Sequence, residues 1–149
     1  KGNTPTNLVK LLSDKKISKI FHFARFDLAI IKKFLNVSCE NVFCTKIASK
    51  LVRTYTDKHG LKDLCKELLG IDLNKSQQCS DWSSDDLSNN QISYAASDVI
   101  YLNELKKKLV EMLKREERLN FANKVFAFLN TRIDLDILGW DGQDIFSHS

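Results

Sequence analysis

The amino-acid sequence predicts one α/β domain in which helices far outnumber strands. A chain of 149 residues has the length of a single domain, and it shows no internal repeat and no low-complexity linker. About six stretches carry apolar residues at helical spacing, whereas only one or two short runs are β-prone. Hydrophobic residues make up 43% of the chain and charged residues 28%, which is typical of a globular domain with a buried core.

Both strand candidates lie in the first third of the chain, and each leads directly into a helix. The run over 19–23 is the clearest strand and precedes a helix over 24–35, while a shorter strand over 42–44 precedes a helix over 45–52. A strand-to-helix unit belongs to a sheet of several strands, because an isolated strand leaves backbone groups unpaired. The number of strands is therefore low for the fold class that these units predict.

The rest of the chain is expected to be helical. Thr4 and Pro5 have the residue types of an N-cap and a first helical position, so they predict a short helix before the first strand. The other expected helices span 61–69, ended by Gly70, then 88–114, opened by a capping box, and 119–129. A short tail from Asp134 to Ser149 follows, with Leu138, Trp140, Ile145 and Phe146 as residues expected to dock on the domain.

Charge and cysteine content limit the possible partners. A net charge of +4 permits binding to a polyanion but does not require it. The four cysteines form no C-x-x-C pair, so we expect reduced thiols rather than a zinc site or a disulfide framework. No apolar run reaches membrane-spanning length and the start carries no signal peptide, so a cytoplasmic protein with no membrane contact is expected.

Two acidic positions are candidates for metal chemistry. Tyr94 and Asp98 are four residues apart on a predicted helix, which places them on one face, one turn apart. A carboxylate there can hold a hard divalent cation, and a phenol can orient a water beside it. Asp27 lies in the first turn of the helix that follows His22 at the end of the first strand. Each residue also has a plain structural interpretation, since a helix N-terminus favours a carboxylate in any case.

A basic loop between two predicted helices is a candidate for phosphate contact. Arg53, Lys58 and His59 flank Tyr55, so this loop combines positive charge with a ring on which a base could stack. The lysine run over 106–108 is interpreted as a solvated helix face. Lys75 lies in the polar segment before the helix of Tyr94 and Asp98.

The order of these motifs resembles one family over nearly the whole chain. The segments 21–28 (Phe-His-Phe-Ala-Arg-Phe-Asp-Leu) and 94–99 (Tyr-Ala-Ala-Ser-Asp-Val) resemble the second and third motifs of the ribonuclease D-like DEDD 3′–5′ exonucleases, in their tyrosine-bearing (DEDDy) form. Segments 44–48 and 59–64, and Lys75 with 80–82, match the family between these motifs. The tail over 138–148 resembles the end of small single-domain bacterial members.

This resemblance implies a ribonuclease H-like fold and a two-metal site with Mg²⁺ or Mn²⁺. Asp98 would bind a metal directly, Asp27 would hold the second metal, and Tyr94 would orient the attacking water. His22 and Lys75 match positions beside the substrate, to which the basic loop adds Arg53, Tyr55 and His59. The implied reaction is hydrolysis of phosphodiesters at nucleic-acid 3′ ends, with RNA favoured over DNA, although no residue identifies a 2′-hydroxyl contact.

The sequence departs from the family pattern at the first motif. The family has an Asp-x-Glu on its first strand, but the only acidic residue before Asp27 is Asp14, in a polar helix end. We therefore expect residues 1–149 to be a single exonuclease domain that is N-terminally incomplete and mostly helical, without the family's opening β-meander. The isolated chain is expected to be weakly active or inactive, and to self-associate through the exposed edge of the first strand. The alternative is a non-catalytic nuclease remnant that binds nucleic acid or a protein partner through the Tyr55 loop.

Overall fold

The structure, a computed structural model, describes the backbone of residues 6–73 and 89–148 and the side chains of 6–73 and 100–148. Thr4 and Pro5, Lys75 and the segment 80–82 lie outside the described residues. The elements are α1 (Thr6–Ser13), β1 (Lys19–Phe21), α2 (Ala24–Leu35), β2 (Val42–Cys44), α3 (Thr45–Val52), α4 (Leu61–Leu64), the π-helical turn η1 (Cys65–Leu69), α6 (Asn89–Arg115), α7 (Leu119–Leu135) and the π-helical turn η2 (Asp136–Trp140).

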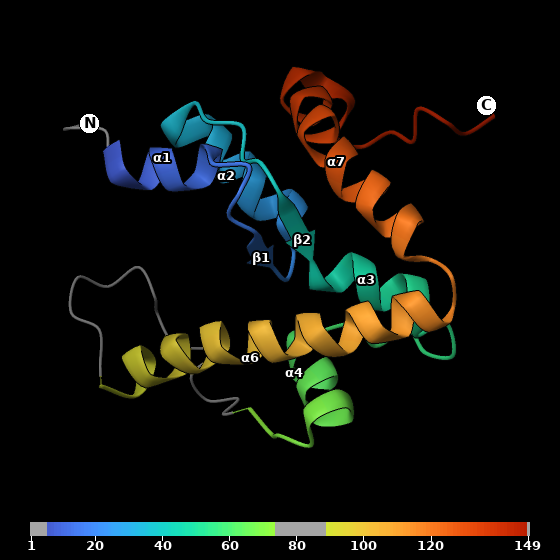
Figure 1. Ribbon diagram of the computed structural model, residues 1–149. Coiled ribbons are helices and arrows are strands. Elements are labelled where there is room, and N and C mark those ends of the chain that lie inside the picture. Colours follow the sequence, from blue (N-terminus) through green and yellow to red (C-terminus); the bar gives the residue numbers. More distant parts are fainter. Residues whose placement is uncertain (1–5, 74–88, 149) are drawn as a thin grey trace.

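A small parallel sheet lies at the centre of the described residues. β1 pairs with β2 so that Ile20 lies opposite Phe43, and α2 makes the connection between the two strands. Figure 1 shows α6 running along one side of this sheet, with α1, α2 and α7 on the other. The prediction of two short strands, each followed by a helix, is confirmed.

The core forms where α6, α7 and the sheet meet. Leu105, Leu109 and Leu113 recur every four residues along α6 and are each 0% exposed, so one stripe of this helix is fully enclosed. On the other side, the Phe126 ring of α7 packs on the Phe43 ring of β2 with 4.9 Å between centroids. These contacts hold the two long helices against the strands.

Gly70 ends the α4–η1 segment as predicted. Its φ of +68° lies in the left-handed region, and its N–H donates to the carbonyl of Lys66 at 3.1 Å. A residue with a Cβ would be strained in this conformation, which is why glycine commonly ends helices.

The C-terminal region differs from the prediction. α7 continues to Leu135 rather than ending near Leu129, because Ile133 (2% exposed) extends the same buried face by one turn. The apolar tail residues are less buried than expected, since Leu138 is 71% exposed and Phe146 is 78% exposed, although the Phe146 ring lies 6.3 Å from the Phe128 ring of α7. Polar contacts hold η2 instead: Asp136 accepts two hydrogen bonds from Arg25, each 2.7 Å long.

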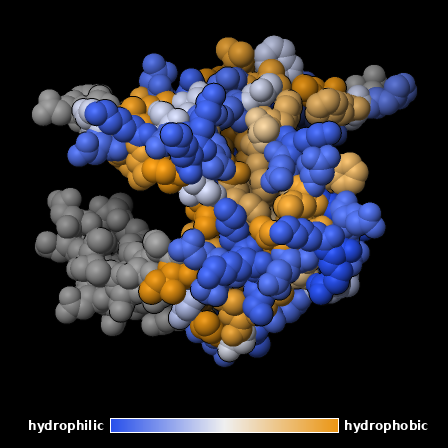
Figure 2. Space-filling model, in the orientation of Figure 1, coloured by the Kyte–Doolittle hydropathy of each residue, from blue (hydrophilic) through white to orange (hydrophobic). Residues whose placement is uncertain are grey.

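Cys39, Cys44 and Cys65 are buried and form no disulfide with one another. None of the described helices is long and apolar enough to span a bilayer. Figure 2 shows apolar side chains at the surface between the α1–α2 side of the molecule and α7.

Candidate active site

Asp27 lies just beyond the carboxyl end of β1, in the first turn of α2. Its side chain is half-buried, and burial raises the pKa of the carboxyl above its ordinary value. Among the described side chains, no lysine, arginine or histidine forms an ion pair with it. A partly desolvated carboxylate without a cationic partner has the chemistry of a metal ligand, because a divalent cation would compensate its charge.

His22 directly follows β1 and lies beside the start of α3. Its Nδ1 is 2.9 Å from the Thr45 hydroxyl, which also donates to the carbonyl of Phe21 at 3.3 Å. Burial, with a smaller contribution from the positive charge of Lys46, lowers the pKa of His22 to about 4, while the backbone of His59 acts in the opposite direction. The imidazole is therefore neutral at pH 7, and its buried Nε2 has no hydrogen-bond partner among the described residues. His22 can act as a neutral hydrogen-bonding group beside the site.

Tyr94 and Asp98 lie on α6, four residues apart on a continuous helix, as predicted. α6 packs along α3 and contacts β1, which brings its backbone to the sheet (Figure 1). The side chains of both residues are outside the described set, as is Lys75. Among the described residues alone, no group of three or more His, Cys, Asp or Glu could hold a metal ion.

The basic loop after α3 is built around a buried arginine. Arg53 is 2% exposed, and its guanidinium donates to Glu67 Oε1 (2.7 Å), the carbonyl of Lys58 (2.6 Å) and the Ser49 hydroxyl (2.9 Å). Its hydrogen bonds are thus used to hold the loop rather than directed at solvent. Tyr55 keeps 66% of its surface exposed, with its hydroxyl donating to Glu67. Hydrogen bonding to Glu67 is the main cause that raises the pKa of Tyr55.

His59 closes the same loop from the other side. Its Nδ1 lies 2.7 Å from the Ser49 hydroxyl, which is fully buried. The structure therefore brings Arg53, Tyr55 and His59 into one hydrogen-bonded cluster, in which the Tyr55 ring is the part most open to a ligand.

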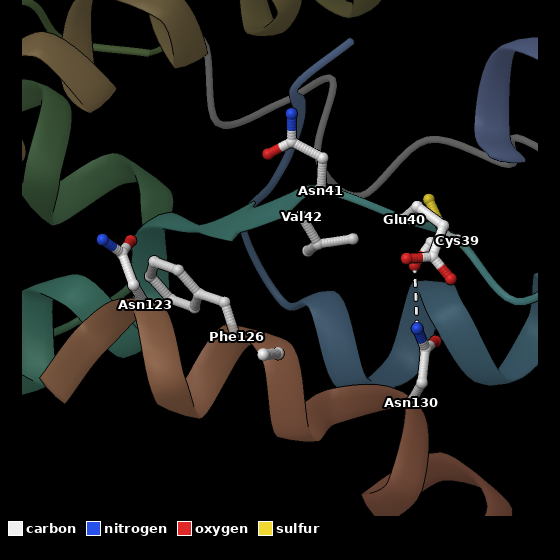
Figure 3. A pocket seen from close by; sticks show the side chains of 8 residues that line it. Cys39, Glu40, Asn41, Val42, Asn123, Phe126 and Asn130 are labelled. Atoms are coloured by element: carbon white, nitrogen blue, oxygen red, sulfur yellow. Dashed lines mark hydrogen bonds between the residues drawn. The ribbon is translucent and has the colours of Figure 1, made fainter. Parts of the chain in front are cut away.

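Two pockets lie at opposite ends of β2. The first, of about 410 Å³, is at the amino end and is lined by Glu40, Asn41 and four positions of α7, among others. Figure 3 shows that its amides do not converge: Asn41 points away from α7, and Asn130 is engaged with the carbonyl of Cys39 at 2.9 Å. The second pocket, of about 280 Å³, is at the carboxyl end and includes Phe23, Cys44 and Lys46. Ligands of open parallel sheets bind outside the carboxyl ends of the strands.

A family model described as 3′–5′ exonuclease matches residues 2–114. The chain belongs to the 3′–5′ exonuclease family. This exonuclease chain is 37% identical over 120 residues to a ribonuclease D of Gluconacetobacter diazotrophicus. The matched region covers 80% of the chain and 30% of that protein. The chain thus spans less than a third of the length of that curated relative.

Solved structures give the same fold. NrnC of Brucella melitensis matches with a TM-score of 0.90 and 55% identity, covering 96% of the exonuclease chain and 69% of NrnC. Similar matches are NrnC structures with bound Mg²⁺ and bound to pGG. Escherichia coli RNase D, an exoribonuclease involved in structured RNA processing, matches with a TM-score of 0.77 and 25% identity over 86% of the chain and 34% of RNase D. The predicted ribonuclease D-like, ribonuclease H-like assignment is confirmed.

Several residues of this exonuclease chain were not found from the sequence. Glu67 and Ser49 complete the Arg53 cluster, and Asp136 joins Arg25 across 111 positions of sequence. A buried arginine requires an acidic partner, so Glu67 could have been sought, but the sequence alone does not say which carboxylate it is.

Proposed function

We propose that this chain is the catalytic part of a metal-dependent 3′–5′ exonuclease that hydrolyses phosphodiesters from nucleic-acid 3′ ends. The observation that carries the proposal is Asp27, a half-buried carboxylate at the carboxyl end of the sheet that lacks a cationic partner among the described residues. Family membership supports the reaction class, and the Mg²⁺ bound by Brucella melitensis NrnC supports a divalent cation.

In this proposal, Asp27 and Asp98 are metal ligands and Tyr94 orients the attacking water. Bound Mg²⁺ or Mn²⁺ would polarise the scissile phosphate and stabilise the attacking and leaving oxygens. Tyr94 acts as a hydrogen-bonding group, because a phenol of ordinary pKa near 10 is mostly neutral at pH 7. Neutral His22 accepts or donates a hydrogen bond at the edge of the site without adding charge beside Asp27.

The proposed substrate is a short oligonucleotide, with RNA favoured over DNA. The pGG bound by NrnC supports this class, as does the description of Escherichia coli RNase D as an exoribonuclease. We assign stacking of a nucleobase to the exposed Tyr55 ring, and place Lys75 and His59 beside the phosphates. Arg53 supports this surface by ordering the loop.

The isolated chain is proposed to be a weak enzyme. It contains two of the four carboxylates that the family resemblance implies, so its metals would be bound weakly. β1 has a strand partner on one side only among the described residues. Self-association through the other edge of β1 is therefore part of the proposal, and light scattering tests it, since a monomer at all concentrations contradicts it.

The test is cleavage of a 5′-labelled short RNA, and of the matching DNA, with Mg²⁺ or Mn²⁺. We expect slow, metal-dependent trimming from the 3′ end that disappears in Asp98→Asn and Asp27→Asn and falls strongly in Tyr94→Phe. Lys107→Ala, an exposed change on α6, is the control and should leave the rate unchanged.

Metal binding gives a second readout that does not depend on turnover. Titration with Mn²⁺ should show binding that is weakened in Asp98→Asn. A chain that neither trims an oligonucleotide nor binds Mn²⁺ would be the non-catalytic remnant, and the proposed function would be wrong.

A further inference from the structure

A basic cavity lies behind α2, between this helix, α3 and α7. It has a volume of about 280 Å³, and its apolar floor includes the rings of Phe23 and Phe128 with Ile47, Val125 and Leu129. Four cations line it, one or two from each helix: Arg25 from α2, Lys46 and Lys50 from α3, and Arg132 from α7.

The cations around this cavity exceed the carboxylates that neutralise them. Asp136 accepts hydrogen bonds from both Arg25 (2.7 Å) and Arg132 (3.1 Å), and the charge of Asp141 also acts on Arg25, so two carboxylates stand against four cations. Lys46 and Lys50 form no ion pair among the described residues. The positive potential that remains favours an anion at the mouth of the cavity.

The floor is suited to a flat ring rather than to an aliphatic chain. Phe23 is 48% exposed and stacks on Phe26 with 11° between the ring planes, so about half of this residue's surface is accessible to a ligand. The Lys46 ammonium lies over the Phe23 ring, 4.8 Å from its centre, in a cation–π contact. An aromatic face with an adjacent cation is the arrangement that binds a nucleobase and its phosphate.

This cavity is separate from the proposed catalytic groups. Successive residues of a helix are rotated by about 100°, so Asp27 projects roughly 200° around α2 from Arg25, which faces α7 and Asp136. α7 packs on α2 and β2, whereas α6, which carries Tyr94 and Asp98, packs on α3 and β1. Asp27 and Arg25 therefore lie on different sides of α2, and the cavity comes nearest to the catalytic groups at Lys46, whose N–H donates to the carbonyl of His22 at 3.1 Å.

We propose that the cavity lined by Phe23, Lys46, Lys50 and Arg132 binds a nucleoside monophosphate or the equivalent nucleotide of a longer strand, at a site distinct from the catalytic one. Its volume of about 280 Å³ is at the lower limit of pockets for small molecules, about 300 Å³, so it accommodates one nucleotide at most and is too small for a duplex. The choice of a nucleotide among anionic aromatic ligands rests on the proposed function, but binding at this site does not require catalysis.

The test is titration of the full 149-residue chain with AMP in EDTA, followed by NMR. We expect chemical-shift changes at the Val125 methyl groups and the Phe128 ring. The double variant Lys46→Ala/Lys50→Ala should weaken binding by about tenfold or more, because it removes two charge-assisted contacts to the phosphate. The matched control, Lys107→Ala/Lys108→Ala, removes the same charge from an exposed part of α6 and should leave the affinity unchanged.

The outcomes separate this site from the catalytic one. Asp98→Asn should abolish trimming yet keep AMP binding at Val125. The reverse result, in which AMP binding is lost in Asp98→Asn but kept in Lys46→Ala/Lys50→Ala, would overturn the proposal. If AMP affinity falls equally in the two double-lysine variants, the cause is a general charge effect. If inorganic phosphate binds as tightly as AMP, the protein contacts no base. If the chemical shifts of Val125 depend on protein concentration alone, a second copy of the chain occupies the cavity. A general charge effect, binding without base contact and occupation by a second copy would each overturn the proposal.

Discussion

The ion pair between Arg25 and Asp136 is predicted to contribute about 1–2 kcal/mol to the free energy of unfolding. Two hydrogen bonds of 2.7 Å join the guanidinium to both carboxylate oxygens, and the Asp136 side chain is 12% exposed. A hydrogen bond to a charged group contributes roughly 1.5–3 kcal/mol. The Arg25 side chain is 40% exposed, however, so screening by solvent reduces the value for the whole pair to about 1–2 kcal/mol.

A double-mutant cycle measures this coupling. Urea unfolding is compared for the unmodified chain, Arg25→Met, Asp136→Asn and the double variant, because Asp136 also accepts a hydrogen bond from Arg132 and a single substitution would remove both contacts. The control cycle uses Glu104 and Lys107, whose ion pair is 3.6 Å long and whose side chains are 53% and 73% exposed. That pair should couple by no more than about 0.5 kcal/mol.

The pH dependence of the coupling provides a second check. The hydrogen bonds from Arg25 hold the pKa of Asp136 below its ordinary value. The stabilisation is therefore fully present above the unfolded-chain pKa, near 4, and is lost as the pH falls through the lower folded value. A coupling below about 0.3 kcal/mol at pH 7, or one equal to that of the exposed control pair, would refute the reasoning.

Three further predictions concern single residues. The His22 ring should show no NMR titration between pH 5 and 8, because its folded pKa is about 4. Since this value is lower than the ordinary one, the free energy of unfolding should fall as the pH drops from about 6.5 to 4. A His22→Asn variant that keeps the same pH profile would contradict this. Gly70→Ala should destabilise the chain by about 1–2 kcal/mol in urea unfolding, because φ is +68°. No atom lies within 4 Å of an added Cβ, so the effect would come from the backbone conformation and not from a steric clash. An unchanged unfolding midpoint would exclude backbone strain. Leu109→Ala should cost about 2–5 kcal/mol because Leu109 is 0% exposed, whereas Phe34→Ala, at 79% exposed, should stay within about 0.5 kcal/mol; similar values for both would show that burial does not decide the effect.

The parts of the fold that depend on local sequence were predictable. The bounds of α2 and α3 agree with the expected helices over 24–35 and 45–52, because each helix follows directly from a strand and its apolar spacing is regular. Gly70 ended its helix as expected, since the left-handed conformation is a property of one residue.

The parts that depend on distant partners were not predictable. Asp136 lay in the expected tail, but it forms an ion-paired cluster with Arg25 and Arg132 that stabilises the extra turn of α7 and η2. The expected phosphate ligand Arg53 is enclosed by partners from the loop and from η1, a contact that only the folded chain creates. The basic cavity likewise joins Lys46 and Arg132, which are far apart in the sequence.

The packing of α6 has a consequence for the precision of the site. The helix spans 27 residues, so it is about 40 Å long, and among its described side chains the first that is fully enclosed is Leu105, seven residues beyond Asp98. Those seven residues make a lever of about 10 Å, so a tilt of about 6° at the Leu105 anchor would displace the Asp98 backbone by about 1 Å. An error of that size can reduce a rate by about 100-fold. Conservative changes at Leu105 or Leu109 can therefore act as alignment mutations, which impair chemistry while every catalytic group is still present.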